Sequence, residues 1–388
     1  MDPIVIVSAA RTPLGAFSGK FKSTSTVELG ATVIKKVVED LDIKVDSVYM
    51  GCVLPAGLGQ SPARQAALCA GLDKAVNCVN INKICGSGMA SIMMGKNAIL
   101  AGENDVVVAG GMENMTKAPY LLEKARSGYR YGDGQIVDHM VRDGLLDAYR
   151  KCVMGVYAEG TAEEYGFTRD QQDEYALNSF LKARNAIENG YFKNEIASVK
   201  VKDKRGDIIV STDEVPFSVD LDKMPKLKPA FKVGGTITAA SASSISDGAA
   251  AMLMMKESMA RRLNLDPIAR IVAYGSHSQE PNRFTTAPIG AIEKALEKSH
   301  WSVNDVDVFE INEAFAVVAM AAIKDCAIDP QKVNVFGGAC ALGHPLGASG
   351  ARIVVTLLNA MRMKNAKKGL ATLCVGGGEG VAMTFEMY

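Results

Sequence analysis

The stretch Cys78-Val79-Asn80-Ile81-Asn82-Lys83-Ile84-Cys85-Gly86-Ser87-Gly88-Met89 joins a strand-like run to a helix-like run and places a cysteine at the junction. Small residues follow Cys85, and a helical pattern continues through Met93, Met94 and Ile99. A cysteine at such a turn lies against unpaired backbone N–H groups and the positive end of the helix dipole. Both favour the thiolate, the reactive form of cysteine. The stretch therefore predicts a nucleophile, with a buried structural cysteine as the alternative.

Two further segments favour the nucleophile. The run Gly343-His344-Pro345-Leu346-Gly347 opens a second helix, so His344 also lies at a helix N-terminus. That position disfavours the imidazolium and keeps a neutral ring that can accept a proton from a thiol. Cys374 ends the strand-like run 370–373, and the glycines after it let the backbone approach a ligand closely. A Cys, a His and a second Cys, each at a strand end or a helix start, predict a covalent acyl-transfer site.

The chain also contains two halves with the same order of elements. The corresponding segments are 4–7 and 268–274, 27–39 and 292–298, 48–52 and 306–310, 62–71 and 313–327, 78–81 and 333–336, the helices after Cys85 and after His344, 106–111 and 370–377, and 249–255 and 381–386. Active sites in open α/β sheets lie beyond the carboxyl ends of strands. A pseudo-twofold pairing of the halves would therefore bring Cys85 and His344 together.

The repeat predicts three parts. An N-terminal half comprises residues 1–111 and 248–267, a C-terminal half comprises residues 268–388, and residues 112–247 form an inserted domain. The insertion carries an amphipathic helix pattern from Asp170 to Asn189 and hairpin-like residues 200–210. Insertions at strand ends commonly build substrate clefts, so we expect this one to line the site. Four of its lysines either contact phosphates or are solvated surface charges: Lys223, Lys226, Lys228 and Lys232.

Composition is that of an ordinary soluble enzyme. A chain of 388 residues suggests two or three domains, and 48% hydrophobic with 22% charged residues implies large buried sheets and helices. The 43 basic and 43 acidic residues give the chain no net charge that would favour binding to nucleic acid or to an anionic membrane. No apolar run approaches the roughly 20 residues that span a bilayer, and a strand begins at residue 4, which leaves no room for a signal or transit peptide. Eight cysteines without a CxxC pair, and four histidines without ligand spacing, predict a reducing, cytoplasmic compartment and no metal site.

These residues resemble the thiolase family, in its short-chain acetyl-CoA acetyltransferase (acetoacetyl-CoA thiolase) branch. The resemblance runs from Ile4 to the C-terminus. It rests on the block Asn82-Lys83-Ile84-Cys85-Gly86-Ser87-Gly88, on Asn312-Glu313-Ala314-Phe315, and on the His344 and Cys374 blocks in the family's order. It implies a five-layer αβαβα thiolase fold built from two duplicated halves with an inserted loop domain. It also implies coenzyme A thioester substrates, no cofactor, and assembly as a homodimer or homotetramer.

The resemblance gives each motif residue a role. Cys85 attacks the acyl thioester while His344 removes its proton, which forms an acyl-enzyme and releases coenzyme A in a ping-pong scheme. Cys374 is the base that removes the α-proton of a second acetyl-CoA. His344 and a water held by Asn312 form one oxyanion site, and the backbone N–H groups of Cys85 and Gly376 form the other. Alternatively, Asn312 is only the N-cap of a helix over residues 313–324.

Coenzyme A contacts follow from the same resemblance. Ser243 is expected to meet the pantetheine arm. The apolar residues expected either to line the tunnel or only to pack in the core are Leu145, Met154, Phe231, Ala239, Ala314 and Phe315. The chain departs from the family's pattern at Val153, Ser241, Ser244, Ser246, Phe284 and Glu379. A carboxylate at Glu379 would oppose a second anion at Cys374 unless it points to solvent.

The predicted function is acetyl-CoA C-acetyltransferase, the reversible Claisen condensation of two acetyl-CoA to acetoacetyl-CoA and coenzyme A. A degradative 3-ketoacyl-CoA thiolase of fatty-acid β-oxidation would use the same residues on longer chains. An inactive acyl-CoA-binding relative is the alternative from another class. A β-ketoacyl synthase would carry a second histidine in place of Cys374. The segment from Tyr120 to Asp147 resembles the short-chain enzymes, whose loop at this position supports tetramers.

Overall fold

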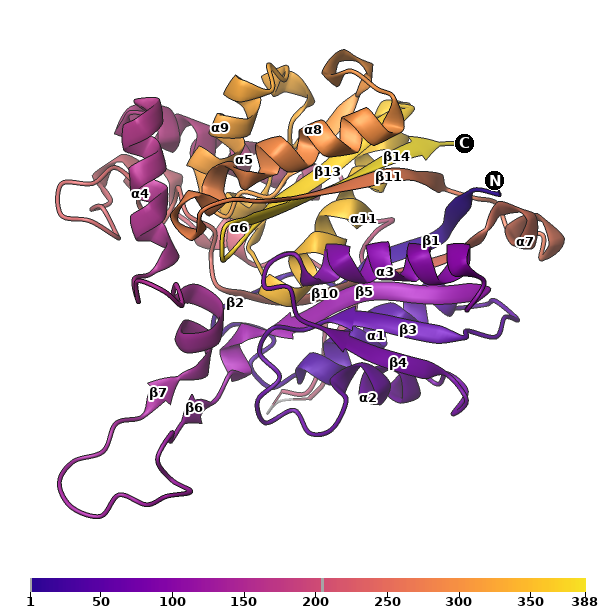
Figure 1. Cartoon of the computed structure of the whole chain (residues 1–388), viewed down its shortest axis with the longest axis horizontal. Coiled ribbons are helices and arrows are strands. Elements are labelled where there is room, and N and C mark those ends of the chain that lie inside the picture. Colours follow the sequence, from indigo (N-terminus) through magenta and orange to yellow (C-terminus); the bar gives the residue numbers. More distant parts are fainter. Residues whose placement is uncertain (1, 204–205) are drawn as a thin grey trace.

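The computed structural model describes residues 2–203 and 206–388, and its main strands form two stacked sheets (Figure 1). The strands of the first sheet are β1 (Ile4–Arg11), β10 (Ser246–Lys256), β5 (Val106–Asn114), β3 (Ser47–Gly51) and β4 (Asn77–Ile81), with the short β2 (Gly15–Ala16) beside β10. The strands of the second sheet are β11 (Ala269–Ser278), β14 (Glu379–Met387), β13 (Lys368–Val375) and β12 (Val308–Ile311). The sheets join where β1 pairs with β11, only at Val5 with Arg270 and at Ile6 with Ala269.

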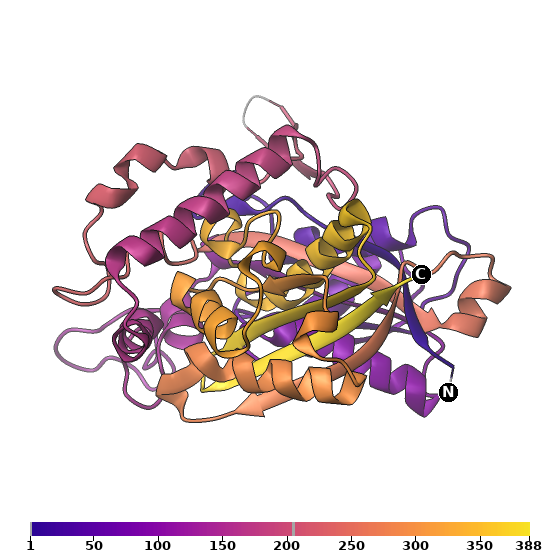
Figure 2. The same ribbon diagram turned by 90° about the horizontal axis from the view of Figure 1, so that it is seen from above.

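Helices lie outside and between the sheets (Figures 1 and 2). The outer helices are α1 (Thr26–Val38) and α2 (Pro62–Cys69) on the first sheet and α8 (Ala287–Ser299) and α9 (Ala316–Asp325) on the second; the inner helices are α3 (Ser87–Ala101) and α11 (Leu346–Lys364). Every residue of α11 from Leu346 to Met361 is buried, as expected of a helix covered by protein on all sides. The five-layer αβαβα thiolase fold is therefore confirmed.

Residues between β5 and β10 form the inserted region. Its elements are η1 (Met115–Lys117), β6 (Tyr120–Leu121), β7 (Val137–Asp138), η2 (Val141–Leu145), α4 (Met154–Tyr165), α5 (Arg169–Glu188), β8 (Val199–Val201), β9 (Ile208–Val210), α6 (Val215–Ser218) and η3 (Leu221–Lys226). A capping box of Thr168 and Gln171 starts α5, which matches the predicted helix. The predicted hairpin is present as antiparallel β8 and β9. The segment joining β6 to β7 extends away from the body (Figure 1).

The remaining elements either connect the two halves or join strands and helices within the C-terminal half. They are α7 (Glu257–Arg262), η4 (Pro281–Thr286), η5 (Val303–Asp305), η6 (Pro330–Lys332) and α10 (Ala339–Leu342). Within the described ranges, no helix combines the length and the apolar composition that crossing a bilayer requires. The same ranges contain no group of three or more His, Cys, Asp or Glu side chains arranged to hold a metal ion.

One expected strand is wrong. Residues 333–336 were the predicted counterpart of β4, but they form only a single parallel bridge, between Val333 and Phe309. Asn334 interrupts the strand because its φ is 44°, in the left-handed region. Its side-chain amide replaces the missing ladder, accepting from the N–H of Ile311 at 2.8 Å and donating to the Ile311 carbonyl at 2.9 Å.

Candidate active site

Cys85 lies in the turn between β4 and α3. The preceding Ile84 has φ of 46°, a left-handed conformation that is strained for a β-branched residue. Two side chains hold this conformation. Asn82 Oδ1 accepts from the Ile84 N–H at 3.0 Å, while Ser87 Oγ accepts from the Lys83 N–H at 2.8 Å and donates to the Ile84 carbonyl at 2.6 Å. Local hydrogen bonds therefore fix the position of Cys85 at the head of α3.

The thiol of Cys85 is buried, and burial raises its pKa to about 11. The backbone N–H groups of Gly376 and of Cys85 itself lie against the sulfur and lower the pKa, but by less, and the buried Glu113 carboxylate raises it further. The expectation that the turn would favour a thiolate is therefore wrong for the resting site. The two N–H groups predicted to form an oxyanion site do face the same sulfur.

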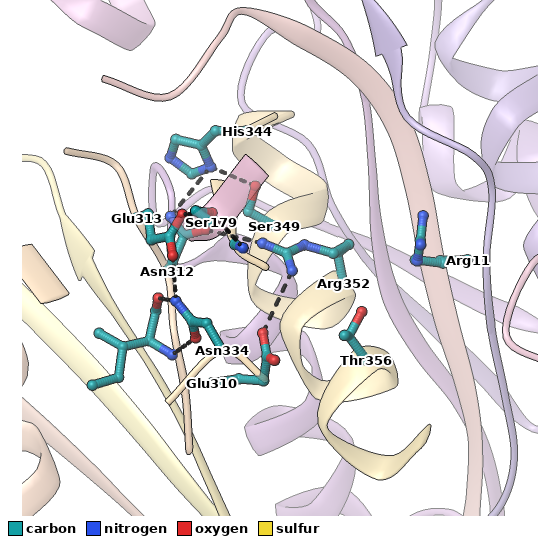
Figure 3. A network of polar contacts seen from close by, with 12 residues as sticks. Arg11, Ser179, Glu310, Asn312, Glu313, Asn334, His344, Ser349, Arg352 and Thr356 are labelled. Carbon is teal, nitrogen blue, oxygen red and sulfur yellow. Dashed lines mark hydrogen bonds and ion pairs between the residues drawn. The ribbon is translucent and has the colours of Figure 1, made fainter. Parts of the chain in front are cut away.

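His344 lies just before α11, with its ring between Asn312 and Ser349 (Figure 3). The distance from His344 Nδ1 to Ser349 Oγ is 2.5 Å. Ser349 donates its one hydroxyl hydrogen to the Pro345 carbonyl at 2.8 Å, so Ser349 Oγ accepts a hydrogen from Nδ1. This arrangement leaves a lone pair on His344 Nε2, which has no hydrogen-bond partner among the described residues. A neutral, unpartnered Nε2 at a cavity wall is ready to accept a proton.

The pKa of His344 is lowered to about 3. Burial is the main cause, and the positive charge of Arg352 is the second. The ring is therefore neutral, as the sequence predicts, although the reason is desolvation and a buried cation rather than the helix terminus alone.

Asn312 follows the last residue of β12, and its N–H bonds to the Thr372 carbonyl at 3.0 Å. Its side chain lies between two site residues: Oδ1 is 3.3 Å from Arg352 Nη2, and Nδ2 is 3.4 Å from His344 Nδ1. The alternative that Asn312 caps the following helix is wrong, because α9 begins at Ala316 and Phe315 occupies the N-cap position.

Cys374 lies in β13, one residue before the end of the strand, and is 1% exposed. Its pKa is well above the ordinary value because of burial first and the neighbouring Cys85 second. A negative charge on Cys85 would therefore oppose one on Cys374. Glu379, whose charge would oppose an anion at Cys374, forms an ion pair with Lys83 in the Cys85 turn. The positive charge of Lys83 therefore offsets the predicted repulsion between the Glu379 carboxylate and an anion at Cys374. The carboxylate does not have to point only to solvent for this.

A cavity of about 430 Å³ opens onto these residues and is lined by Cys85, His344 and Gly376. Every predicted coenzyme A contact lines it as well: Leu145, Met154, Phe231, Ala239, Ser243, Ala314 and Phe315. Cys374 and Asn312 are each 1% exposed and are not part of the lining. The Ser243 hydroxyl donates to the Ala314 carbonyl at 3.0 Å, which leaves its oxygen able to accept from a ligand.

Sequence reasoning missed much of the lining and the residues behind it. Lining residues not predicted as contacts include Ile84, Val141, Gly144, Gly155, Ala230, Ala242, Ile245 and Leu346, while Val153, Ser244 and Phe284 were noted only as departures. None of the four lysines lines this cavity in the described part of the chain. Lys223 instead pairs with Asp220, and Lys232 pairs with Glu163. Arg352 was also missed, although a charged residue inside the apolar run of α11 was a signal.

Comparison with family models decides the classification. The model described as "Thiolase, N-terminal domain" matches residues 4–258, and the model described as "Thiolase, C-terminal domain" matches residues 265–387. The chain belongs to the thiolase family. This thiolase is therefore an acyltransferase.

Individual relatives cover this thiolase from end to end. It is 51% identical over 391 residues to the acetyl-CoA acetyltransferase of Escherichia coli, covering 100% of this chain and 99% of that one. It is 46% identical over 393 residues to a probable acetyl-CoA acyltransferase of Staphylococcus aureus, with full coverage of both. The structure of a Bacillus anthracis acetyl-CoA acetyltransferase superposes with a TM-score of 0.97 at 40% identity, covering 100% of this chain and 99% of that one. The Acat5 thiolase of Ascaris suum, in complex with coenzyme A, superposes at 0.94 with 41% identity and full coverage of both chains.

Proposed function

We propose that this thiolase catalyses the reversible condensation of two acetyl-CoA to acetoacetyl-CoA and coenzyme A, with Cys85 as nucleophile. The observation that carries the proposal is that one cavity is lined by Cys85, by His344 with its unpartnered Nε2, and by Gly376, whose backbone N–H lies against the Cys85 sulfur. A thioester carbonyl in this position meets a nucleophile, a base and two N–H donors together.

In the first half-reaction, His344 Nε2 takes the Cys85 proton as the sulfur attacks the thioester carbonyl. The tetrahedral oxyanion is held by the N–H groups of Cys85 and Gly376. Collapse of this intermediate re-forms the carbonyl of the acetyl–Cys85 thioester and breaks the bond to the coenzyme A sulfur, which takes the proton of Cys374 and leaves as a thiol. The products are an acetyl-enzyme, a His344 imidazolium and a Cys374 thiolate. The opposite charges of the His344 imidazolium and the Cys374 thiolate stabilise each other in a buried site.

In the second half-reaction, the Cys374 thiolate removes an α-proton from a second acetyl-CoA. The enolate oxygen accepts hydrogen bonds from His344 Nε2–H and from a water held by Asn312. The enolate carbon then attacks the acetyl group, the carbon–carbon bond forms, and the bond to the Cys85 sulfur breaks. Cys85 recovers its proton from His344, and Cys374 keeps the α-proton, so the resting site is regenerated with all protons accounted for.

Three aromatic rings favour a short acyl group. Phe284 and Phe231 both pack edge-on against Phe315, with ring centroids 6.4 Å and 5.6 Å from it, and all three line the cavity. Phe284 is itself only 3% exposed. A long acyl chain would have to displace packed rings, which is why we place the degradative, long-chain thiolase second.

The test is coenzyme A-dependent thiolysis of a 3-ketoacyl-CoA series from four carbons to a long chain. We expect the four-carbon substrate to give the highest kcat/KM, Cys85→Ala to be inactive, and acetyl-CoA to add one acetyl group to the Cys85 peptide in mass spectra. Cys326→Ala is the matched control, because Cys326 lies in the cap of α9, outside the site. Faster turnover of longer chains would identify a degradative thiolase. Coenzyme A binding without any turnover would support the alternative that the protein is an inactive acyl-CoA-binding relative.

We further propose that the chain is a cytoplasmic homotetramer, or a homodimer, with the three parts predicted from its repeat. Two exposed features support assembly. Strand β4 is the last strand of its sheet and carries the 41% exposed Val79, and such an edge pairs readily with another strand. The segment from β6 to β7 exposes several large apolar side chains: Tyr120, Leu122, Tyr129, Tyr131 and Ile136. Sedimentation should show a tetramer that becomes a dimer when residues 123–135 are replaced by a short glycine-rich turn, whereas a monomer in both cases would refute the assembly.

A further inference from the structure

A buried polar cluster lies directly behind the proposed enolate site and has no part in the steps above. Arg352 projects from α11 toward Asn312 and Glu310, which lie at the end of β12 (Figure 3). The exposed fraction is 0% for Arg352 and 1% for both Asn312 and Glu310. The guanidinium is therefore a fully buried cation within hydrogen-bond reach of a residue that the mechanism uses.

The contacts of Arg352 do not resemble those of a side chain kept for stability. Its Nη1 is 3.6 Å from Glu310 Oε2, too long for a good charged hydrogen bond, and Arg352 Nε and Nη1 have no hydrogen-bond partner among the described residues. Glu310 Oε1 likewise has none. A buried cation with such contacts is not compensated for the cost of its desolvation, and an apolar pair would be the more stable choice. A role in the site is the better explanation.

The chemistry of the guanidinium determines how Asn312 is oriented. Arginine has five donors and no acceptor, so the atom of Asn312 that faces Arg352 Nη2 at 3.3 Å must be the carbonyl oxygen Oδ1. The NH₂ group is therefore turned to the opposite side, 3.4 Å from His344 Nδ1. Because Nδ1–H already donates to Ser349, this approach is not a hydrogen bond and the NH₂ hydrogens stay available to the enolate site. A neutral residue at position 352 would allow the amide to rotate by 180° and present its oxygen, which would repel an enolate.

We propose that Arg352 is a positioning residue for carbon–carbon bond formation: it fixes the Asn312 amide so that the NH₂ group supports the enolate site, and it places a buried positive charge behind that site. This inference rests on the proposed function. Glu310 holds Arg352 from the other side and has a pKa raised to about 8 by burial, which the charge of Arg352 only partly offsets. A carboxyl so close to neutrality leaves most of the positive charge available to the site.

The two half-reactions separate this role from a structural one. Exchange of labelled coenzyme A into acetyl-CoA requires Cys85, His344 and the Cys85 and Gly376 N–H groups, but no enolate. Hydrogen exchange at the acetyl methyl group, and condensation itself, require the enolate site. We expect Arg352→Met to lower methyl exchange and condensation by about 10²–10³-fold, the loss typical of one oxyanion donor. Coenzyme A exchange should fall by no more than about threefold, because loss of the Arg352 charge raises the pKa of His344 and leaves it an effective base.

Three further variants sharpen the test. Asn312→Ala should show the same pattern, and the double variant Arg352→Met/Asn312→Ala should be no slower than Asn312→Ala alone, because both act through one group. Arg352→Lys retains a charge and a donor, so it should recover part of the condensation rate and serves as the folding-tolerant variant. Glu310→Gln is the matched control, since it alters the buried pair but keeps Arg352, and condensation should fall by less than tenfold.

Equal losses in both half-reactions, or additive losses in the double variant, would overturn the inference and leave Arg352 as a structural residue. Unchanged condensation in Arg352→Lys and Arg352→Met would overturn it as well. The proposed function fails separately, if the wild-type protein catalyses neither exchange reaction.

Discussion

At the scale of single residues, burial and nearby N–H groups act in opposite directions on Cys85. The N–H groups of Cys85 and Gly376 stabilise negative charge at the sulfur, yet the surrounding protein removes it from water and the net pKa is about 11. In the proposed mechanism, the N–H groups therefore act mainly on the oxyanion of the bound thioester, which would form in the same place. The site holds a protonated thiol beside a neutral imidazole until substrate arrives.

This balance predicts the pH dependence of alkylation. Since only the thiolate reacts and the pKa lies near 11, the rate of Cys85 labelling by iodoacetamide should rise about tenfold per pH unit from pH 6 to about pH 10. Labelling is measured on the Cys85 peptide by mass spectrometry, with acetyl-CoA protection as the control for the site. A plateau near pH 7 would mean that a thiolate–imidazolium pair already exists in the free enzyme.

Ser349 gives a second prediction at this scale. Ser349→Ala removes the acceptor for His344 Nδ1–H, so the tautomer with a free Nε2 is no longer fixed. Acylation of Cys85 should slow by about ten- to a hundredfold, the effect of leaving a buried donor unsatisfied. Ser91→Ala is the matched control, because Ser91 is also a buried helical serine and bonds only to the Gly88 and Gly110 carbonyls. Equal acylation rates in the wild type and Ser349→Ala would show that fixing the His344 tautomer does not contribute to acylation.

At the scale of elements, the turn after β4 and the turn after β13 must keep a fixed relation, because Cys85 lies in one and Gly376 in the other. They pack closely: a Cβ on Gly86 would lie 2.8 Å from Val375 Cγ2. The Lys83–Glu379 ion pair joins the same two turns at their half-exposed side. The pair therefore supports, from outside, the relative position of the Cys85 and Gly376 N–H groups that the proposed second oxyanion site requires.

We expect Lys83→Met and Glu379→Gln each to lower kcat/KM for thiolysis by up to about fivefold, since a partly exposed pair contributes roughly 0.2–1 kcal/mol. The double variant should lose no more than either single change, which a double-mutant cycle measures. The exposed Lys200–Asp207 pair is the control and should have no effect. Independent, additive losses would mean that the two side chains do not act as a pair.

At the scale of the whole molecule, Arg11 joins the first sheet to the inserted region. It is fully buried in β1, bonds to Glu195 at 2.5 Å and to both oxygens of Asp213 at 2.7 and 2.9 Å, and lies over the Phe192 ring. Unlike Arg352, it is well paired, and its carboxylate partners raise its pKa even though burial opposes them. The ion cluster fixes the base of the insertion that carries most of the cavity wall.

Arg11→Met should lower the free energy of unfolding by about 3–5 kcal/mol, because two buried carboxylates lose their counter-charge. The urea midpoint of the circular dichroism signal measures the loss. Arg261→Met, which removes an exposed i,i+4 pair with Glu257, is the control and should cost less than 1 kcal/mol. A loss below 1 kcal/mol in Arg11→Met would show that the insertion is held by its apolar contacts alone.

The sequence by itself determined the elements whose signals are local. The capped helix α5, the strand-to-helix turn at Cys85 and the glycine turn after Cys374 follow from neighbouring residues, whereas the five-layer fold was implied by the resemblance to the thiolase family. Where a side chain of the segment itself replaced the backbone ladder, as Asn334 does within residues 333–336, the local pattern was misleading. The motif residues could also be named from sequence, because each stands at the end of an element.

Only the tertiary structure decided the protonation and the surroundings of those residues. The raised pKa of Cys85 and the lowered pKa of His344 are caused first by burial, a property of all the layers packed around the site and of no single segment. The contact between Arg352 and Asn312 joins positions 40 residues apart. Desolvation and long-range contacts depend on which surfaces meet, and the surfaces meet only when both sheets close over α3 and α11.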